Sequence, residues 1–522
     1  MNSPRWSTVR AAVQCAAWVA FIALLIATRD PLPAGGASDI VPQMSVHLGI
    51  AASFSARTVL SAFLPGAIIV LATAVFGRLF CGWLCPLGAT LDVSDRLWNP
   101  AKRNRLKNAE KSISLKRYKY ILAAVSLLLA LSGIQAAGII DPLSLATRSY
   151  ITVLYPFADY IVKGVFTIAG GFPLIGAITE PVFSFLKDSV LDYNPVLFAN
   201  HLWVLLFFIL LLSLSSLMRR FWCQSLCPLG AILALSSRIS FFRRIVDTEK
   251  CTRCLRCVKA CRMNAISDDG TGTSPVECIQ CLECLDSCEY GAIRFGFIRA
   301  FKKKAGGDPR KSVRPGFSRR DVLAGAITAL TLVPAFRLNA AYRADSSAVI
   351  RPPGALPESE FLSLCVRCGE CMKVCPTNGL HPTFVESGIE GMFTPRLIPR
   401  IGWCEKNCNL CMQVCPSGAL RPLEVPQKET AVIGTAVITR DLCIPWAEHR
   451  NCIVCEEVCP TAMKSIRLKE ETIIDKTGRP VKVKLPFVLE TVCIGCGICE
   501  NKCPVHGSAA IRVRTRKTPA NI

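Results

Sequence analysis

The sequence has little charge and little histidine, and it lacks several common catalytic motifs. Of its 522 residues only 19% are charged and five are histidines, too few for a protein built around many haems. There is no C-x-x-C-H haem attachment site, no G-x-x-x-x-G-K-[ST] phosphate loop and no dinucleotide fingerprint after a predicted strand. These absences argue against multihaem cytochromes, P-loop nucleotidases and nicotinamide-dependent dehydrogenases.

Cysteine, apolar residues and positive charge are abundant instead. The chain has 29 cysteines, 51% hydrophobic residues, a mean hydropathy of +0.38 and a net charge of +23. The cysteines lie in tight clusters, which favours metal ligation over a disulfide framework. Most basic residues flank apolar segments, where the positive-inside rule explains them, so we expect no nucleic-acid partner.

Four uncharged apolar stretches predict a membrane protein. They cover residues 11–28, 58–77, 120–140 and 195–218, and each is about the 20 residues that a spanning helix needs. Ten Lys or Arg lie in 78–119 but only three in 141–194, which predicts a cytoplasmic first loop and an outward second loop. The apolar part of the outward segment, 164–179, predicts interfacial or re-entrant helices, with an extra pair of spans as the alternative.

A repeat links the second and fourth apolar stretches. Residues 77–91 and 219–233 share nine identities in fifteen at an offset of 142, including a C-x-x-x-C-P motif. This indicates a duplicated two-helix unit within a four-helix bundle. Its four thiols, predicted to converge between the halves, are those of Cys81, Cys85, Cys223 and Cys227. An iron–sulfur centre, a copper ion, a transient disulfide and simple packing all remain open for them.

Two regular ferredoxin motifs follow the bundle. Each obeys C-x-x-C-x-x-C-x-x-x-C, a spacing typical of 4Fe–4S ligation rather than zinc, although Arg262 and Glu289 replace the usual proline after the last cysteine. Because the fourth cysteine of each motif ligates the other cluster in two-cluster ferredoxins, we assign two ligand sets. They are Cys251, Cys254, Cys257 and Cys288, and Cys278, Cys281, Cys284 and Cys261.

A basic segment separates these motifs from the C-terminal part. It ends in Ser-Arg-Arg-Asp-Val-Leu, with Arg319 and Arg320 as the pair, and is followed by fifteen uncharged apolar residues. This resembles a twin-arginine export signal at an internal position, and an ordinary stop-transfer helix is the alternative. Both interpretations place the C-terminal part outside, and we expect the apolar helix to stay as an uncleaved anchor.

The C-terminal part contains four further cysteine groups, each followed by proline. Two keep the regular spacing and two widen the first gap. The groups are Cys365, Cys368, Cys371 and Cys375; Cys404, Cys408, Cys411 and Cys415; Cys443, Cys452, Cys455 and Cys459; and Cys493, Cys496, Cys499 and Cys503. Four more clusters bring the total to six. We expect the first group to exchange its last cysteine with the fourth, and the second with the third, with sequential exchange as the alternative.

A few polar and sulfur residues lie outside these motifs. We expect Cys15 to pack in the first apolar helix, and His47 and His201 to be interfacial polar residues rather than ligands. Asp141 is either an acceptor of quinol protons or a helix-start residue before Pro142. The predicted domains are a four-helix membrane domain (1–240), a ferredoxin (241–296), a basic linker (297–320), a signal or anchor helix (321–340) and an α+β polyferredoxin (341–522).

The whole pattern resembles a known pair of proteins joined in one chain. The first half is similar to the membrane H subunit of the periplasmic nitrate reductase system and its methylamine-utilisation relatives, and the second half to the partner G subunit. The resemblance implies a quinol-dehydrogenase module in the bacterial inner membrane, with a cytoplasmic ferredoxin and a periplasmic polyferredoxin. It implies quinone, a periplasmic reductase, dehydrogenase or cytochrome, and cytoplasmic ferredoxin as partners.

A second function is compatible with the same motifs. Proteins that assemble copper oxidases or mature nitrous-oxide reductase share the C-x-x-x-C-P element, so a metal-handling or assembly factor is the alternative. The direction of electron flow and the quinone-site residues are left open by the sequence, as is catalysis by the chain itself.

Overall fold

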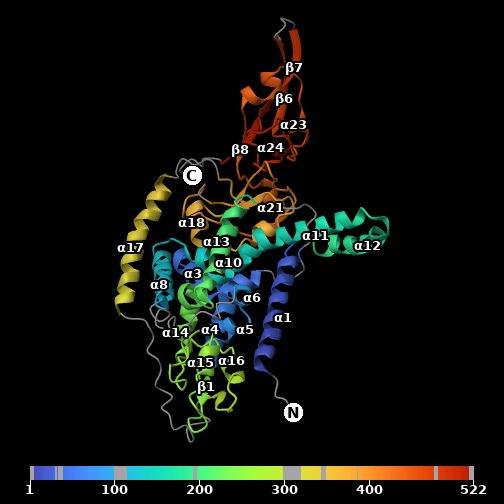
Figure 1. The fold of residues 1–522 in the computed structure, drawn as a ribbon. Coiled ribbons are helices and arrows are strands. Elements are labelled where there is room, and N and C mark those ends of the chain that lie inside the picture. The colour runs from blue at the N-terminus through green and yellow to red at the C-terminus, as the bar shows by residue number, and fades with distance from the viewer. Residues whose placement is uncertain are drawn as a thin grey trace. The chain divides into compact units, whose positions relative to one another are not determined.

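The computed structural model describes most of the chain and divides it into two compact units (Figure 1). The described residues are 5–29, 32, 39–98, 115–191, 197–297, 319–342, 349–384, 386–474 and 480–515. Unit 1 comprises 1–26, 37–150 and 202–335, and unit 2 comprises 27–36, 151–201 and 336–522. Each cysteine motif therefore lies wholly within one unit.

Unit 1 consists of apolar helices above a small two-stranded domain (Figure 1). Helix α3 packs on α8, and α14 packs on both α4 and α8. Helix α3 also contacts α4, and Gly66 permits this close approach, because a Cβ at Gly66 would lie 2.8 Å from the Val46 nitrogen. The helices are α1 (Trp6–Ala27), α2 (Ile40–Gln43), α3 (Val46–Ala56), α4 (Leu64–Phe76), α5 (Leu79–Trp83), α6 (Pro86–Trp98), α8 (Tyr118–Leu131), α9 (Ala137–Ile140), α10 (Pro142–Ser149), α13 (His201–Ser213) and α14 (Pro228–Ser237).

Two helices among the described residues are long and apolar enough to cross a membrane. One is α1, which matches the first predicted span, and the other is the continuous helix Pro142–Gly170. The remaining predicted spans correspond to shorter apolar helices, Ser61–Phe76, Tyr118–Leu131 and His201–Ser216. The four-span bundle is therefore not confirmed, and a long helix occupies part of the segment predicted to be interfacial or re-entrant.

The small domain of unit 1 contains the two regular cysteine motifs. Strand β1 (Phe242–Val246), before the first motif, pairs antiparallel with β2 (Ile293–Phe297), after the second. Each motif continues into a short helix, α15 (Arg256–Ala260) or α16 (Glu283–Asp286), entered through a leucine with positive φ. The two motifs thus repeat one backbone path, as expected for a two-cluster ferredoxin.

Unit 2 combines a helical hairpin with the C-terminal domain. The hairpin is α11 (Tyr155–Gly170) and α12 (Pro173–Ser189), which contact each other and are separated by Gly171 and Phe172. Helix α17 (Arg319–Tyr342) crosses the boundary between the units. Residues 298–318, nearly all of the predicted basic linker, lie outside the described residues.

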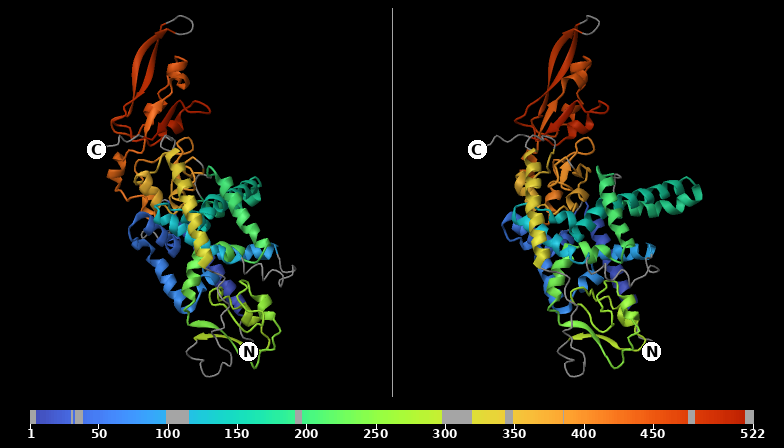
Figure 2. Two further views of the ribbon diagram at one scale, coloured as in Figure 1. Left: turned by 90° about the vertical axis from the view of Figure 1, so that its left-hand side faces the viewer. Right: turned by 60° about the vertical axis from the view of Figure 1, so that its left-hand side comes forward.

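The C-terminal domain is built from short helices and three antiparallel strand pairs. The pairs are β3 (Leu380–Pro382) with β4 (Pro395–Leu397), β5 (Thr435–Ile438) with β8 (Ile511–Arg514), and β6 (Ile466–Ile474) with β7 (Pro480–Val488). The nine-residue β6–β7 ribbon projects from the domain (Figure 2). The helices are α18 (Glu358–Leu364), α19 (Glu370–Lys373), α20 (Leu410–Gln413), α21 (Val425–Thr430), α22 (Ile444–Ala447), α23 (Val454–Glu457) and α24 (Ile498–Lys502).

Candidate metal centres

One hollow in the ferredoxin domain of unit 1 is lined by four cysteines. They are Cys251, Cys254, Cys257 and Cys288, the set assigned from spacing, and the hollow has a volume of about 360 Å³. A Cβ on Gly270 would touch the Cys257 sulfur at 3.7 Å, so this glycine leaves room beside the thiols. The donor set and the space both fit a 4Fe–4S cubane.

The second ligand set lies at the side of the ferredoxin that faces the helices. Burial raises the pKa of Cys278 to about 11 and that of Cys281 to about 12. The thiols of Cys261, Cys278 and Cys281 also raise the pKa of Cys284 because they lie close to it. Such buried thiols stay protonated until iron displaces their protons.

In the C-terminal domain the hollows overturn our expected exchange between groups. Cys375 of the first group lines a hollow of about 400 Å³ with three cysteines of the second. Cys503 of the fourth group lines a hollow of about 370 Å³ with three of the third. The prediction that the first group exchanges with the fourth was therefore wrong, and the sequential alternative holds. The lining cysteines are Cys375, Cys404, Cys408 and Cys411, and Cys443, Cys452, Cys455 and Cys503.

Strand pairing is the physical reason for this exchange. Strand β3 follows the first group and pairs with β4, which precedes the second. Strand β5, which lies between the second and third groups, pairs with β8, which follows the fourth. Each strand pair thus closes two successive motifs into one two-cluster module.

The other two sets of the C-terminal domain follow the same rule. Burial raises the pKa of Cys371, and its neighbouring thiols Cys365, Cys368 and Cys415 raise it further. The pKa of Cys499 rises through burial and through Cys493, Cys496 and Cys459.

All 29 cysteines are free thiols. In the described part of the chain no three Cys, His, Asp or Glu side chains are placed to hold one metal ion. A 4Fe–4S cubane distributes its thiolates over four irons, so its ligands need not surround a single ion.

The four thiols of the C-x-x-x-C-P motifs lie close enough to interact electrostatically. Burial raises the pKa values of Cys85 and Cys227, and the neighbouring thiols of Cys81 and Cys223 raise both pKa values further. Cys85 and Cys227 each precede a helix that begins at proline, α6 or α14, and the Cys227 sulfur accepts the Gly230 N–H at 3.2 Å. Each proline therefore begins a helix here instead of ending one.

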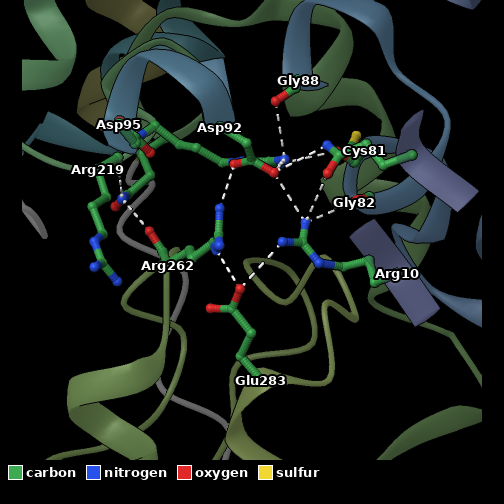
Figure 3. Close-up of polar contacts among 12 residues, drawn as sticks. Arg10, Cys81, Gly82, Gly88, Asp92, Asp95, Arg219, Arg262 and Glu283 are labelled. Atoms are coloured by element: carbon green, nitrogen blue, oxygen red, sulfur yellow. Dashed lines mark hydrogen bonds and ion pairs between the residues drawn. The ribbon is translucent and has the colours of Figure 1, made fainter. Parts of the chain in front are cut away.

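A charge network joins these turns to the ferredoxin (Figure 3). The Asp92 carboxylate forms ion pairs with Arg10 at 3.0 Å, Arg220 at 2.7 Å and Arg262 at 2.7 Å. Arg10 and Arg262 also meet the Glu283 carboxylate of the ferredoxin, at 3.2 and 2.6 Å. Although burial alone would raise the pKa of Asp92, these arginines hold it well below its usual range.

Family models match the segments that carry these cysteines. Three models, each described as a 4Fe-4S binding domain, match residues 58–105 and 200–248, 244–267 and 361–381, and 276–291 and 490–506. The ferredoxin-type protein MauM of methylamine utilisation from Methylorubrum extorquens is 37% identical over 38% of this chain and 90% of its own length. The chain belongs to the MauM and NapG ferredoxin-type family.

Further relatives extend this family assignment. MauM of Paracoccus denitrificans is 36% identical over 40% of this chain and 92% of its own length. The ferredoxin-type protein NapG of Escherichia coli is 35% identical over 31% of this chain and 68% of its own length. No solved structure matches the chain. Ferredoxin-type iron–sulfur electron transfer is thus the chemistry of this family member.

Sequence reasoning missed one buried polar pair in this ferredoxin-type protein. His47 Nδ1 lies 3.1 Å from Asp141 Oδ2, and both side chains are fully buried. Asp141 also accepts the backbone N–H groups of Leu143 and Ser144, so it is the predicted helix-start residue as well. The two residues are 94 positions apart, so no local pattern reveals their contact.

Three other predicted residues can be placed. His201 Nδ1 contacts only the nearby carbonyl of Phe198, at 2.6 Å, in keeping with a local polar role. Cys15 is exposed on α1, so the prediction that it packs against other parts of the chain was wrong; the buried residues of α1 are Arg10, Gln14, Phe21 and Leu25. The side chain of Arg320 is exposed at the start of α17.

Proposed function

We propose that the protein is a membrane-bound, quinol-dehydrogenase-like carrier that passes electrons between the quinone pool, or a cytoplasmic ferredoxin, and a periplasmic redox protein. The observation that carries this proposal is an apolar contact in unit 1. Cys81 and Cys223 pack against Met263, Ala265 and Ile279, the same residues that the ferredoxin ligands Cys261, Cys278 and Cys281 contact. Iron–sulfur centres at both thiol sets would supply one-electron steps at short range.

The buried pair His47–Asp141 supports a quinol substrate. Quinol oxidation releases protons as well as electrons, and titratable groups inside apolar helices are functional candidates by default. Ser126 Oγ donates its proton to the Ala123 carbonyl, so at 2.8 Å it accepts from His47 Nε2. The Asp141 carboxylate lies 3.1 Å from Nδ1, so both ring nitrogens of His47 face polar partners inside the helices.

Contacts within each unit support the proposed sidedness. In unit 1, the backbone N–H groups of Trp6 and Ser7 donate to Asp286 of the ferredoxin at 3.0 and 2.6 Å. In unit 2, Asn200 donates to Glu386 of the polyferredoxin at 3.2 Å. Asn200 lies before α13, and the ferredoxin follows its other end. The positive-inside rule then assigns the ferredoxin to the cytoplasm and the polyferredoxin to the periplasm.

The test is reduction of the clusters in membrane vesicles, followed by electron paramagnetic resonance. We expect a reduced quinol analogue to reduce the clusters of the wild type, and His47→Gln to slow this reduction at least tenfold without changing reduction by dithionite. His201→Gln is the matched control and keeps the wild-type rate. Failure of the quinol analogue, with rapid reduction by soluble ferredoxin, would replace quinol by ferredoxin as the donor.

A metal-handling role is the second candidate, and the four neighbouring thiols of the C-x-x-x-C-P motifs, two of them buried, favour it. Under that function the purified protein binds or reduces copper stoichiometrically at these thiols. Copper analysis of wild type and a Cys85→Ser/Cys227→Ser variant separates the two functions, since only a copper site loses its copper in the variant.

A further inference from the structure

The two halves of the duplicated unit hold each other's cysteine turns. Arg220 of the second half donates to the carbonyl oxygens of Cys81 at 3.0 Å and Gly88 at 3.2 Å in the first half. Arg78, its counterpart at the offset of 142, approaches Gly230 of the second half so closely that a Cβ there would lie 2.9 Å from its Nη2. Arg220 thus holds the turn that carries Cys81 and Cys85, and Arg78 lies close against the turn that carries Cys223 and Cys227.

Arg78 is a buried cation whose positive charge is only weakly compensated by a neighbouring anion. Its side chain is 1% exposed, and its only ion pair among the described residues is with Glu277 at 3.7 Å. Lys119 already holds both oxygens of that carboxylate at 2.7 Å. Arg78 Nε has no hydrogen-bond partner in the described structure. A buried, underpaired guanidinium is costly, which indicates that another negative group belongs beside it.

The thiols of the two turns lie close enough to supply this charge. Cys81 and Cys227 interact electrostatically with Arg78, and Cys223 interacts with Arg220. Two further buried donors on the second turn, Trp222 Nε1 and Ser225 Oγ, also lack partners in the described structure. Iron–sulfur centres are anionic when held by four thiolates, and N–H and O–H donors to their sulfurs are typical.

We propose that Cys81, Cys85, Cys223 and Cys227 jointly hold one additional iron–sulfur centre between the two halves, with Arg78 and Arg220 as its positioning and charge-compensating residues. Transfer of a preassembled 4Fe–4S cluster from a donor protein breaks four Fe–S bonds to the donor's thiolates and the four S–H bonds here. It forms four new Fe–S bonds, and the four protons released protonate the donor's thiolates. A single copper or zinc ion fits less well, since no three of the described thiols are placed around one point. The proposal does not depend on quinol.

Iron and sulfide analysis of anaerobically purified protein tests the centre. Six cubanes give about 24 irons per chain, and a seventh raises this to about 28. We expect Cys85→Ser/Cys227→Ser to lose about four irons relative to the wild type while the ferredoxin resonance signals persist. Equal iron in both proteins overturns the proposal, whether or not copper is present. Persistence of the ferredoxin signals shows that the variant is folded.

The role of the arginines is tested by potentiometric titration of the extra signal. Arg78→Met is expected to shift its midpoint to more negative potential or to remove the signal, because reduction adds negative charge that the guanidinium offsets. The equally buried Arg148, which donates to the carbonyls of Gly138 and Ile139, gives the control variant Arg148→Met with an unchanged midpoint. Unchanged midpoints in both variants would contradict the assignment to Arg78.

Discussion

Asp92 and Asp95 lie one helical turn apart on α6 and have opposite electrostatic environments. Asp92 is surrounded by Arg10, Arg220 and Arg262 and stays ionised. Among the described residues, Asp95 accepts a hydrogen bond from the backbone N–H of Arg220, at 3.3 Å. Burial, together with the charge of Asp92, raises the pKa of Asp95 to about 6. One carboxylate thus stabilises the fold when charged and the other when protonated.

Replacing Asp95 with asparagine should stabilise the protein at neutral pH. Because the folded pKa of about 6 exceeds the unfolded value, the wild type loses stability as pH rises from about 4 to about 6. Asp95→Asn removes this loss and gains about 2 kcal/mol at pH 7. Melting temperatures between pH 4 and 7 provide the measurement. A variant that keeps the wild-type pH slope would contradict the assigned environment.

At the scale of elements, the two C-x-x-x-C-P turns differ where the ferredoxin packs. A Cβ on Gly82 would overlap the carbonyl oxygen of Ile279, which lies between two cluster ligands. The corresponding residue of the second copy, Gln224, instead donates to the carbonyl of Arg262 at 3.0 Å. One turn therefore approaches the ferredoxin backbone directly and the other reaches it through a side chain.

Gly82→Ala should therefore weaken the contact between helices and ferredoxin. We expect a destabilisation of about 1–3 kcal/mol from overpacking, seen as a lower melting temperature of the ferredoxin cluster signals. Gly164→Ala in α11 is the matched control, since nothing lies within 4 Å of its added Cβ, and it should be neutral or slightly stabilising. Equal effects of both substitutions would argue against the close approach.

The sequence predicted the cysteine groups, the duplicated turns and the ligand set of the first hollow, because these depend on local spacing. It did not predict the exchange between groups in the C-terminal domain, which depends on β5 pairing with β8, from Ile438 with Ile511 to Thr435 with Arg514. The His47–Asp141 contact was missed for the same reason. Long-range pairing leaves no local signal in a single sequence.

Sequential exchange predicts which double variants lose one cluster. Cys375 and Cys408 line the same hollow, so Cys375→Ser/Cys408→Ser should lose about four irons. Cys368 and Cys408 belong to different sets, so Cys368→Ser/Cys408→Ser should lose about eight. Iron analysis of both double variants measures these losses, and unchanged signals of the ferredoxin in unit 1 serve as the control for folding. A loss of about eight irons in Cys375→Ser/Cys408→Ser would instead support an exchange between the first and fourth groups.

At the scale of the whole molecule, hydropathy and helix length identify the spans differently. Hydropathy alone predicted four, whereas the structure contains the long helix Pro142–Gly170 where charge counting suggested an outward loop. A π-helical segment, Tyr150–Leu154, lies inside it and contains no charge that hydropathy would register as a break. Compositional windows therefore cannot separate a bent helix from two short ones.

The proposed topology predicts that export of the polyferredoxin depends on the paired arginines of the proposed export signal. Replacing Arg319 and Arg320 with lysine should keep the polyferredoxin inside, so that a tag after Ile522 becomes protected from periplasmic protease. A tag at Gly306 should stay protected in both proteins. Normal export of the variant would favour the stop-transfer interpretation and remove the need for the twin-arginine route.

The crossed arginines have an evolutionary consequence. Arg220 closes the turn that carries Cys81, and Arg78 approaches the turn that carries Cys227, so neither copy fastens its own thiols. A protein with a single copy would thus need a second molecule of itself to complete the same arrangement. Gene duplication would have converted this homodimer into one chain and left each half free to diverge, as Gly82 and Gln224 have done.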